Sequence, residues 1–360
     1  MTEPDRAPNP MGTDGFEFVE YTAPDPRLLG ALFEQLGFAL VARHRSKDVA
    51  LYRQGGVNFV VNREPDSFAQ SFARVHGPSA CAVAIRVKDA ARAYQRALEL
   101  GAKPHLGPVG PMELNIPAIQ GIGGSLIYLV DRYPGSASGI TIYDVDFVPV
   151  AGAGQHPQGA GLLEVDHLTH NVYAGRMDVW AQFYEKLFNF REIRYFDIKG
   201  KKTGLTSRAL TSPCGKIRIP INEPSDRKSQ IQEYLDAYRG EGIQHIALST
   251  ADIFATVEEM RARGVRFLDT PDSYYERVDA RVPGHGEDLA RLRANRILID
   301  GEGVDKDRRE DKLLQIFTET VIGPIFFEII PRKGNEGFGE GNFRALFESI
   351  EADQIARGVV

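Results

Sequence analysis

The sequence predicts an α+β protein of two domains, in which each half contains two units of one strand, one helix and several strands. Three observations predict this class: the length of the chain, an internal repeat and a linker between the repeated halves. The chain has 360 residues, which corresponds to two domains at roughly 150 residues per domain. The repeat carries most of the argument, because a missed repeat leads to the wrong fold.

The first repeated stretch pairs residues 21–41 with residues 171–193. Each copy reads as a strand, a polar turn, a short amphipathic helix and a second strand. Within the helices, LFEQLGF (Leu32–Phe38) matches FYEKLFNF (Phe183–Phe190). The two halves therefore begin in the same way.

The second repeated stretch pairs residues 80–104 with residues 243–268. Each copy has an apolar strand and then a helix whose apolar residues recur three and four positions apart. Gly264 is placed to end the second of these helices. The β-rich stretches that follow end at residues 125–134 and 325–334, where Arg132 aligns with Arg332.

The linker is residues 150–161, VAGAGQHPQGAG, whose small and polar residues are typical of a loop between domains. We therefore expect an N-terminal domain over 14–150 and a C-terminal domain over 161–360. Residues 1–13 are polar and Pro-rich, which indicates a disordered tail and not a secretory signal.

Two features belong to the C-terminal half alone. Residues 276–309 are rich in Arg and Asp, and we interpret them as an insert with a short helix near 286–294. Residues 342–357 predict an amphipathic helix with Asn342 as its N-cap. Its apolar face would consist of Phe343, Leu346, Phe347 and Ile350.

Composition excludes several classes of protein. Lys and Arg number 43 and Asp and Glu 49, so the net charge is −6, which argues against nucleic acid or an anionic membrane surface as the main partner. Apolar runs such as residues 321–330 are far shorter than the ~20 residues of a membrane span. Cys81 and Cys214 provide no disulfide framework. A reducing cytoplasm is the expected compartment.

Three predicted strands of the C-terminal half each carry one side chain that can bind a metal: His167 in VDHLTHN, His245 in IQHIAL and Glu328 in FFEII. Two histidines and one carboxylate with open positions opposite them form the facial triad of non-haem Fe(II) oxygenases. The open positions can take a bidentate substrate and O2. The sequence therefore predicts an iron site in this half.

The repeat supplies an internal comparison for this site. Projection of the three positions onto the N-terminal half gives Phe16, Ala82 and Tyr128, and these residues cannot complete such a triad. We therefore expect the N-terminal domain to be a structural copy without metal.

His170 is an alternative to His167 as the first ligand. The two histidines are three residues apart, so in a strand they face opposite sides. Strand parity alone leaves open which of them faces the metal.

The residues of the C-terminal half resemble the 4-hydroxyphenylpyruvate dioxygenase family. The resemblance covers nearly the whole of that half and rests on VDHLTHN (165–171), NEPSDRKSQIQEYL (222–235), GIQHIAL (242–248), LLQIFT (313–318), FFEII (326–330) and GFGEGNF (337–343). It implies the vicinal oxygen chelate fold, in which paired βαβββ units form an open barrel around the metal, like glyoxalase and the extradiol dioxygenases. The first ligand of this family follows an Asp, which favours His167 over His170.

The resemblance also implies residues around the substrate. Catalytic roles fall on Gln244, Gln315 and Phe343. Substrate contacts fall on Ser207, Asn222, Gln230, Gln315, Phe317, Phe338, Asn342 and Phe343. Phe326 joins them because it shares a strand face with Glu328.

Some of these assignments have simpler alternatives. Gln244 neighbours His245 and should point away from the metal, so we expect it behind the ligand. Phe317, Phe326 and Phe343 could serve the core alone. Gln230, at a helix start, could simply be solvated.

The implied reaction converts 4-hydroxyphenylpyruvate and O2 into homogentisate and CO2, through oxidative decarboxylation, ring hydroxylation and side-chain migration. The C-terminal helix would act as a lid, and the family is usually homo-oligomeric, as dimer or tetramer. The alternatives are 4-hydroxymandelate synthase, a ring-cleaving extradiol dioxygenase, and a non-catalytic binding module of the same superfamily.

Overall fold

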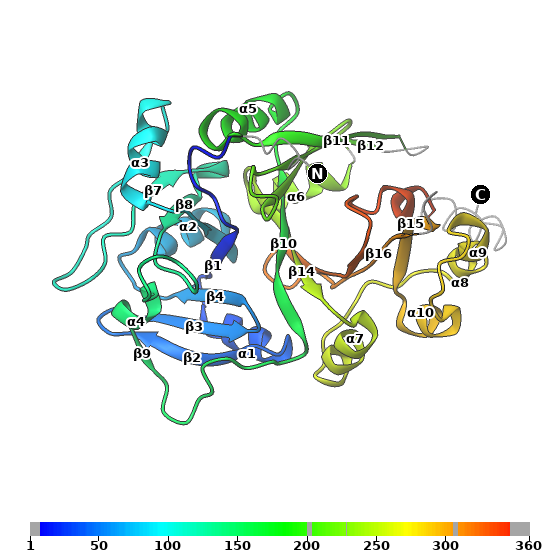
Figure 1. The fold of residues 1–360 in the computed structure, drawn as a ribbon, viewed down its shortest axis with the longest axis horizontal. Helices are drawn as coiled ribbons and strands as arrows, with labels where there is room; N and C mark the ends of the chain where they lie inside the picture. The colour runs from blue at the N-terminus through cyan, green and yellow to red at the C-terminus, as the bar shows by residue number, and fades with distance from the viewer. Residues whose placement is uncertain (1–7, 200–203, 228, 305–308, 346–360) are drawn as a thin grey trace, which may run out of the picture.

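A computed structural model describes residues 8–199, 204–227, 229–304 and 309–345. Two curled sheets of mixed strands form the protein, one from each half of the chain, and they lie side by side (Figure 1). Among the described residues, none of the helices is long and apolar enough to cross a membrane.

The N-terminal sheet contains two units of the same plan, joined by helix α2 (Phe68–His76). The first unit is β1 (Phe16–Thr22), α1 (Arg27–Gln35), β2 (Ala39–His44), β3 (Val49–Gln54) and β4 (Val57–Asn62). The second unit is β5 (Ser79–Arg86), α3 (Ala90–Glu99), β6 (Pro104–His105), β7 (Ala118–Gln120), the turn η1 (Ile122–Gly124) and β8 (Leu126–Val130). Helix α4 (Ile142–Asp146) and strand β9 (Phe147–Pro149) complete this half.

The C-terminal sheet repeats the plan, with helix α6 (Gln230–Tyr238) between its units. The first unit is β10 (Leu162–Asn171), α5 (Met177–Phe188), β11 (Arg191–Lys199), β12 (Gly204–Thr211) and β13 (Arg218–Pro224). The second unit is β14 (Gly242–Thr250), α7 (Ile253–Ala262), β15 (Leu298–Val304), β16 (Glu310–Phe317) and β17 (Phe326–Ile330). Helices α8 (Asp272–Tyr275), α9 (Val278–Arg281) and α10 (Leu289–Asn295) precede β15, and β18 (Arg332–Lys333) pairs with β16.

The strand orders of the two sheets correspond. The N-terminal order β2-β3-β4-β1-β5-β8-β7-β6 matches the C-terminal order β11-β12-β13-β10-β14-β17-β16-β15. In both sheets the first strands of the two units are antiparallel neighbours, and each is parallel to the last strand of its own unit. The paired βαβββ architecture expected from the sequence is confirmed.

Helix ends follow local chemistry. Side chains of Asp89, Ser229 and Asp252 accept hydrogen bonds from backbone N–H groups in the first turns of α3, α6 and α7, which satisfies donors that the helix itself leaves free. Gly264, with φ of +92°, follows α7 at the position expected from the sequence, because a left-handed residue favours glycine there.

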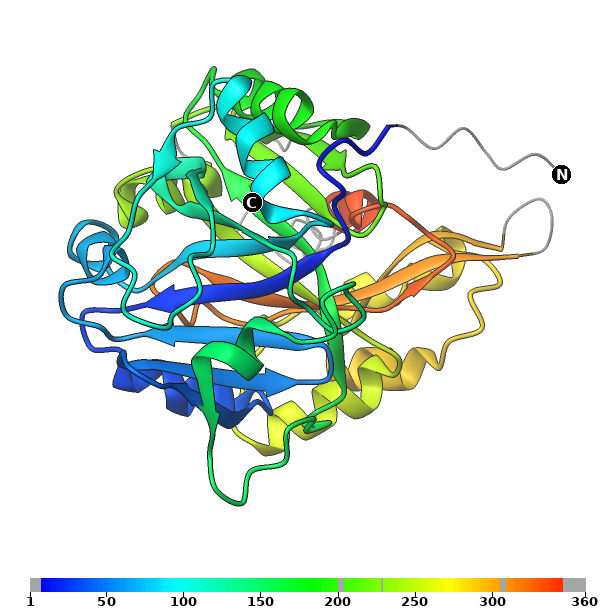
Figure 2. The same cartoon turned by 60° about the vertical axis from the view of Figure 1, so that its left-hand side comes forward.

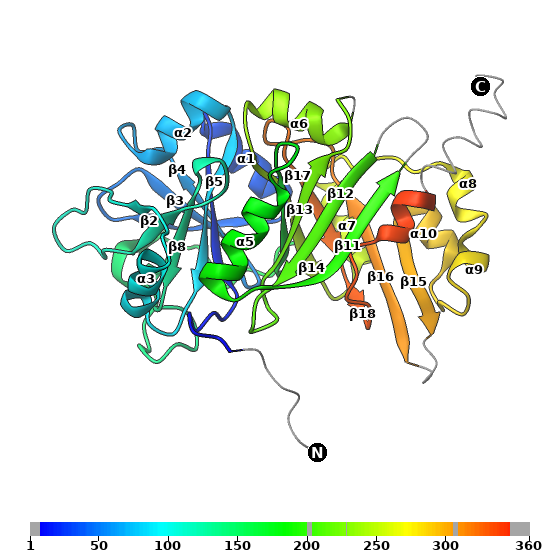
Figure 3. The same cartoon turned by 90° about the horizontal axis from the view of Figure 1, so that it is seen from above.

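Alternate residues of each strand point to opposite faces of its sheet. One face of the sheets, with residues such as Tyr21, Phe59 and Phe327, packs with the helices into one core cluster that spans both halves. Tyr21 and Phe327 come from different halves, and their ring centroids are 6.5 Å apart. The opposite face of each sheet is curled inward, as the view from above shows (Figure 3). The C-terminal concave face holds the candidate site.

Three expectations about the termini and the insert were wrong. Residues 8–13 are not a disordered tail, because Met11 is buried in the core cluster and Asn9 hydrogen-bonds Thr13. The insert does not extend to 309, because residues 298–304 form β15 and pair with β16, although the short helix expected within it is present as α10. Asn342 is not an N-cap, because the helical turn already begins at Glu340. The remainder of the expected C-terminal helix, 346–357, lies outside the described residues.

Candidate metal centre and its pocket

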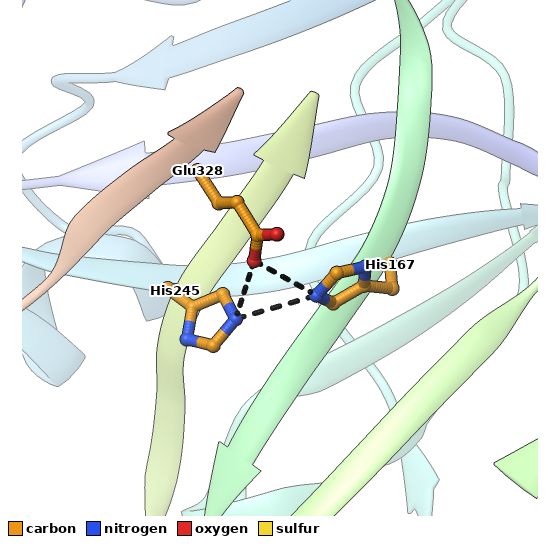
Figure 4. A group of neighbouring side chains, drawn as sticks. All are labelled: His167, His245 and Glu328. Atoms are coloured by element: carbon orange, nitrogen blue, oxygen red, sulfur yellow. Dashed lines mark hydrogen bonds and ion pairs between the residues drawn. The ribbon is translucent and has the colours of Figure 1, made fainter. Parts of the chain in front are cut away.

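His167, His245 and Glu328 meet on the concave face of the C-terminal sheet (Figure 4). They come from β10, β14 and β17, which are adjacent strands at the centre of the sheet. The Nε2 atoms of the two histidines are 3.3 Å apart, and each lies 3.3 Å from Oε2 of Glu328. All three side chains are largely buried. The arrangement brings together the three residues that the sequence predicts as ligands.

Strand register explains how the three side chains converge. His167 lies opposite Ala247 on β14, and Ala247 lies opposite Glu328 on β17. His245 is two residues before Ala247 and therefore shares its face. Because alanine carries only a methyl group, the central position leaves room for the side chains on both sides of it.

His170 faces the other side of β10. Its Nε2 lies 2.7 Å from the hydroxyl of Tyr184 on α5, within the core. Burial lowers the pKa of His170 to about 3. The structure thus groups His167, and not His170, with the other candidate ligands.

Asp166 contacts the Nδ1 side of the His167 ring, and Arg332 in turn contacts Asp166. Oδ1 of Asp166 lies 2.8 Å from Nδ1 of His167, and Asp166 also accepts hydrogen bonds from Nε and Nη2 of Arg332, both at 2.8 Å. Burial acts to raise the pKa of Asp166, but the hydrogen bonds from Arg332 and His167 hold that pKa well below its usual range. The carboxylate fixes the orientation of the imidazole, as partners behind metal-binding histidines do.

The charge state of Glu328 suits a cation. Burial acts to raise its pKa, but the charge and hydrogen bond of His167 and the contact with His245 lower that pKa to about 2. Glu328 is therefore an anionic oxygen donor at neutral pH, next to two imidazole nitrogens. This donor set matches iron and related divalent metals.

A cavity of about 60 Å³ adjoins the three residues. Six residues predicted to contact substrate line it: Ser207, Asn222, Gln315, Phe317, Phe338 and Phe343. Nε2 of Gln315 donates to Oε1 of Glu328 at 3.0 Å. Phe338 meets the His167 ring edge-on, with centroids 5.2 Å apart. The predicted aromatic and amide residues thus surround the candidate metal centre.

Three predicted residues support the site from behind. Gln244 contacts Nδ1 of His245 through Oε1 at 3.1 Å, so it lies behind the ligand as strand parity predicts. Phe326 stacks on the His245 ring at 4.9 Å. The amide of Asn342 donates to Oε1 of Gln315 at 2.7 Å. None of these three is among the residues that line the cavity.

Gln230 is outside the cavity wall. It is the exposed first residue of α6 and does not line the cavity. The sequence position that predicted a substrate contact is thus occupied by a solvated glutamine at a helix start.

Five residues of the cavity wall were not predicted to contact a ligand: Thr169, Phe196, Leu205, Pro220 and Glu340. Oγ1 of Thr169 lies 2.9 Å from Nε2 of His245. Thr169 could have been found, because it is two residues from His167 on the same strand face. Phe196 lies opposite Ser207 on the neighbouring strand, a pairing that no local pattern indicates.

Register also corrects one position of the internal comparison. Phe18 pairs with Ala84, and Ala84 pairs with Tyr128. In the C-terminal sheet, His167 pairs with Ala247 and Ala247 pairs with Glu328 in the same way. The counterpart of His167 is therefore Phe18 and not Phe16. Ala82 and Tyr128 keep their places as counterparts of His245 and Glu328. The same register shift lies between Phe16 and Phe18 on β1 and between Val165 and His167 on β10, which supports this correspondence.

Family models and curated proteins match nearly the whole of this chain. The family model described as hydroxyphenylpyruvate dioxygenase, N-terminal, matches residues 7–148, and the glyoxalase/bleomycin resistance protein/dioxygenase superfamily model matches residues 164–277. Hemolysin VllY of Vibrio vulnificus is 63% identical over 98% of both chains. A 4-hydroxyphenylpyruvate dioxygenase of Pseudomonas aeruginosa is 60% identical over 98% of this chain and 97% of its own.

Among solved structures, a mutant of 4-hydroxymandelate synthase from Streptomyces coelicolor matches with a TM-score of 0.79 and 27% identity, over 96% of this chain and 100% of its own. This likeness covers both halves, so the paired sheets are a shared architecture. The family model and the identity over nearly the full length lead to one assignment: this chain belongs to the 4-hydroxyphenylpyruvate dioxygenase family.

Proposed function

We propose that this chain converts 4-hydroxyphenylpyruvate and O2 into homogentisate and CO2 at an Fe(II) ion bound by His167, His245 and Glu328. The observation that carries the proposal is the buried cluster of two imidazoles and one carboxylate beside a cavity of aromatic and amide side chains. Family membership supports the reaction and the substrate. A non-catalytic binding module would have no use for such a cluster.

The donor set fits Fe(II), because two neutral imidazoles and one carboxylate leave open positions on one side of the metal. When bound there, Fe(II) would be chelated by the α-keto acid and would activate O2. The role of the protein is positional: Asp166 and Gln244 orient the two imidazoles, and Gln315 orients the carboxylate.

Ser207 and Asn222 are well placed to recognise the phenol. They lie opposite each other on β12 and β13, and both line the cavity while largely buried. A buried hydroxyl and amide disfavour a substrate that lacks the phenol oxygen, because they would be left without a partner. Phe338 and Phe343 would flank the ring and exclude water.

The cavity is too small for the substrate as it stands. A volume of about 60 Å³ holds a few water molecules, whereas pockets for organic ligands have roughly 300 Å³ or more. Phe338, Glu340 and Phe343 form one side of this cavity. We infer that the segment 337–343 moves aside when substrate enters and closes over it afterwards.

A chain that ends at Glu336 is expected to bind Fe(II) but to lose turnover by about a hundredfold or more, the range associated with loss of substrate positioning. Single-turnover product formation and Fe(II) titration measure the two effects. A Phe343→Ala variant is the matched control, because it opens the wall and keeps Asn342 bonded to Gln315. Full turnover in the truncated chain would show that the segment is no lid.

The overall proposal is tested by loading the chain with Fe(II) without oxygen, adding 4-hydroxyphenylpyruvate and O2, and identifying the product. Homogentisate is the expected product. 4-Hydroxymandelate would instead place the chain with the synthase, and turnover of catechols would indicate ring cleavage. Bound iron without turnover of any of these substrates would contradict all three enzyme functions.

We also propose a cytoplasmic location and a homo-oligomer, either dimer or tetramer. Both cysteines are free, which suits a reducing compartment. The oligomeric state rests on the family resemblance alone.

A further inference from the structure

A second cavity lies on the concave face of the N-terminal sheet, in the place that corresponds to the metal centre. Its volume is about 590 Å³, compared with about 60 Å³ beside the candidate ligands. This size is in the range of sites for small organic ligands. Helix α4, in blue-green, crosses in front of the strands on this side (Figure 2), and its residues Ile142 and Tyr143 line the cavity. The N-terminal half thus has a space of ligand size at the place where the C-terminal half has its candidate metal ligands.

A carboxyl group lies in the wall of this cavity. Glu20 is on β1, two residues after Phe18, and is 5% exposed. Its Oε1 accepts a hydrogen bond of 2.7 Å from the amide of Asn62. Burial raises the pKa of Glu20, although the bonds from Asn62 and Tyr128 act to lower it. Within the described part of the chain, no ion pair joins Glu20 to a cation.

The loop 106–117 contributes to the wall of the cavity and is held by an ion pair and hydrogen bonds. Oε2 of Glu113 lies 2.7 Å from Nζ of Lys47, and Glu113 also accepts hydrogen bonds from the hydroxyl of Ser46 and from the backbone N–H of Gly110. Asp146 of α4 accepts from the backbone N–H of Leu114 at 3.1 Å. These contacts hold the loop in place.

The lining favours a cation with an apolar body. Three carboxylates, Glu20, Glu113 and Asp146, face one cationic side chain, Lys47, which is already paired with Glu113. Burial lowers the pKa of the two lining histidines, His44 and His105, so they add no positive charge near neutral pH. The remaining wall is largely apolar and includes five aromatic rings, those of Phe18, Tyr94, Tyr128, Tyr143 and Phe147.

Aromatic faces and a buried carboxylate are the usual partners of an organic ammonium group. We propose that this cavity binds a small arylalkylamine, with its ammonium group on the carboxylate of Glu20 and its ring among the aromatic side chains of the wall. A cationic ligand compensates the desolvation of the Glu20 carboxylate, which a neutral or anionic ligand does not.

The test is calorimetric titration of the Fe(II)-loaded full chain with 2-phenylethylammonium, under anaerobic conditions. Saturable binding with a Kd of about 1 mM or tighter is expected. Two probes of matched shape, 2-phenylethanol and 3-phenylpropionate, are expected to bind at least about tenfold more weakly, which corresponds to 1.4 kcal/mol or more. Lack of saturable amine binding, or equal binding of the three probes, would overturn the proposal.

The location is tested by variants. Glu20→Gln keeps an acceptor for Asn62 but removes the charge, so amine affinity should fall at least about tenfold, the effect of one tenfold step in Kd, while turnover of 4-hydroxyphenylpyruvate is unchanged. Glu34→Gln, on the exposed face of α1, should change neither. Val60→Phe should also weaken binding, because it fills the cavity, and thermal melting verifies that both cavity variants fold. Amine binding that survives Glu20→Gln and disappears in His245→Ala would place the amine at the metal centre and refute the proposal.

Discussion

Replacement of His167 by alanine is expected to abolish Fe(II) binding and to reduce formation of homogentisate to below about one thousandth of the parent rate, a loss of about 4 kcal/mol of transition-state stabilisation. The imidazole Nε2 lies 3.3 Å from both other candidate ligand atoms, so its removal leaves only one imidazole and one carboxylate. Fe(II) titration and product assays at saturating substrate measure the two losses. His245→Ala and Glu328→Ala should have the same result.

His170→Ala is the matched control, since it removes a histidine three residues away on the same strand. The imidazole of His170 forms a hydrogen bond with the hydroxyl of Tyr184 in the core. The variant should therefore lose about 1–3 kcal/mol of unfolding free energy, as core substitutions commonly do. Its Fe(II) affinity should stay near the parent value. A fully active His167→Ala variant together with an inactive His170→Ala variant would show that the other histidine binds the metal.

Much of the fold could be predicted because the chain contains its plan twice. Helix periodicity and the glycine after α7 are local signals, and the repeat adds a second reading of each. Strand β15 was missed because its sequence, LIDGEGV, contains two glycines and two acids and lies in a charged stretch. Its pairing with β16 decides that it is a strand, and such long-range pairing overrides local propensity.

The candidate site could be predicted in its chemistry but not in its geometry. Histidine and carboxylate side chains in separate strands are visible in the sequence, whereas the choice between His167 and His170 depends on register and on the partner across the core. The same limit applies to Phe18, because its pairing with Ala84, and not the local sequence, makes it the counterpart of His167 in place of the expected Phe16. For Gln230, the motif predicted a substrate contact, but the structure places this residue, exposed, at the start of α6.

The second large effect is expected at Asp166, which the sequence marks only as the residue before the first candidate ligand. The Asp166→Asn variant should lose about 3–5 kcal/mol of unfolding free energy, the usual result when one partner of a buried ion pair is removed. The side chain of Arg332 is only 11% exposed and would be left with its charge uncompensated. Urea denaturation in the presence of a chelator measures this loss without a contribution from bound metal.

The same substitution should weaken Fe(II) binding by roughly 10- to 100-fold, because the carboxylate that orients His167 loses its charge. Asp178→Asn is the matched control: Asp178 pairs with Arg208 at 2.6 Å but is 74% exposed, so its loss should be under about 1 kcal/mol. In the double variant Asp166→Asn, Arg332→Gln, the unpaired charge is gone, so its stability should be higher than the sum of the single losses predicts. Additive losses together with unchanged Fe(II) affinity would mean that Asp166 neither compensates Arg332 nor positions His167.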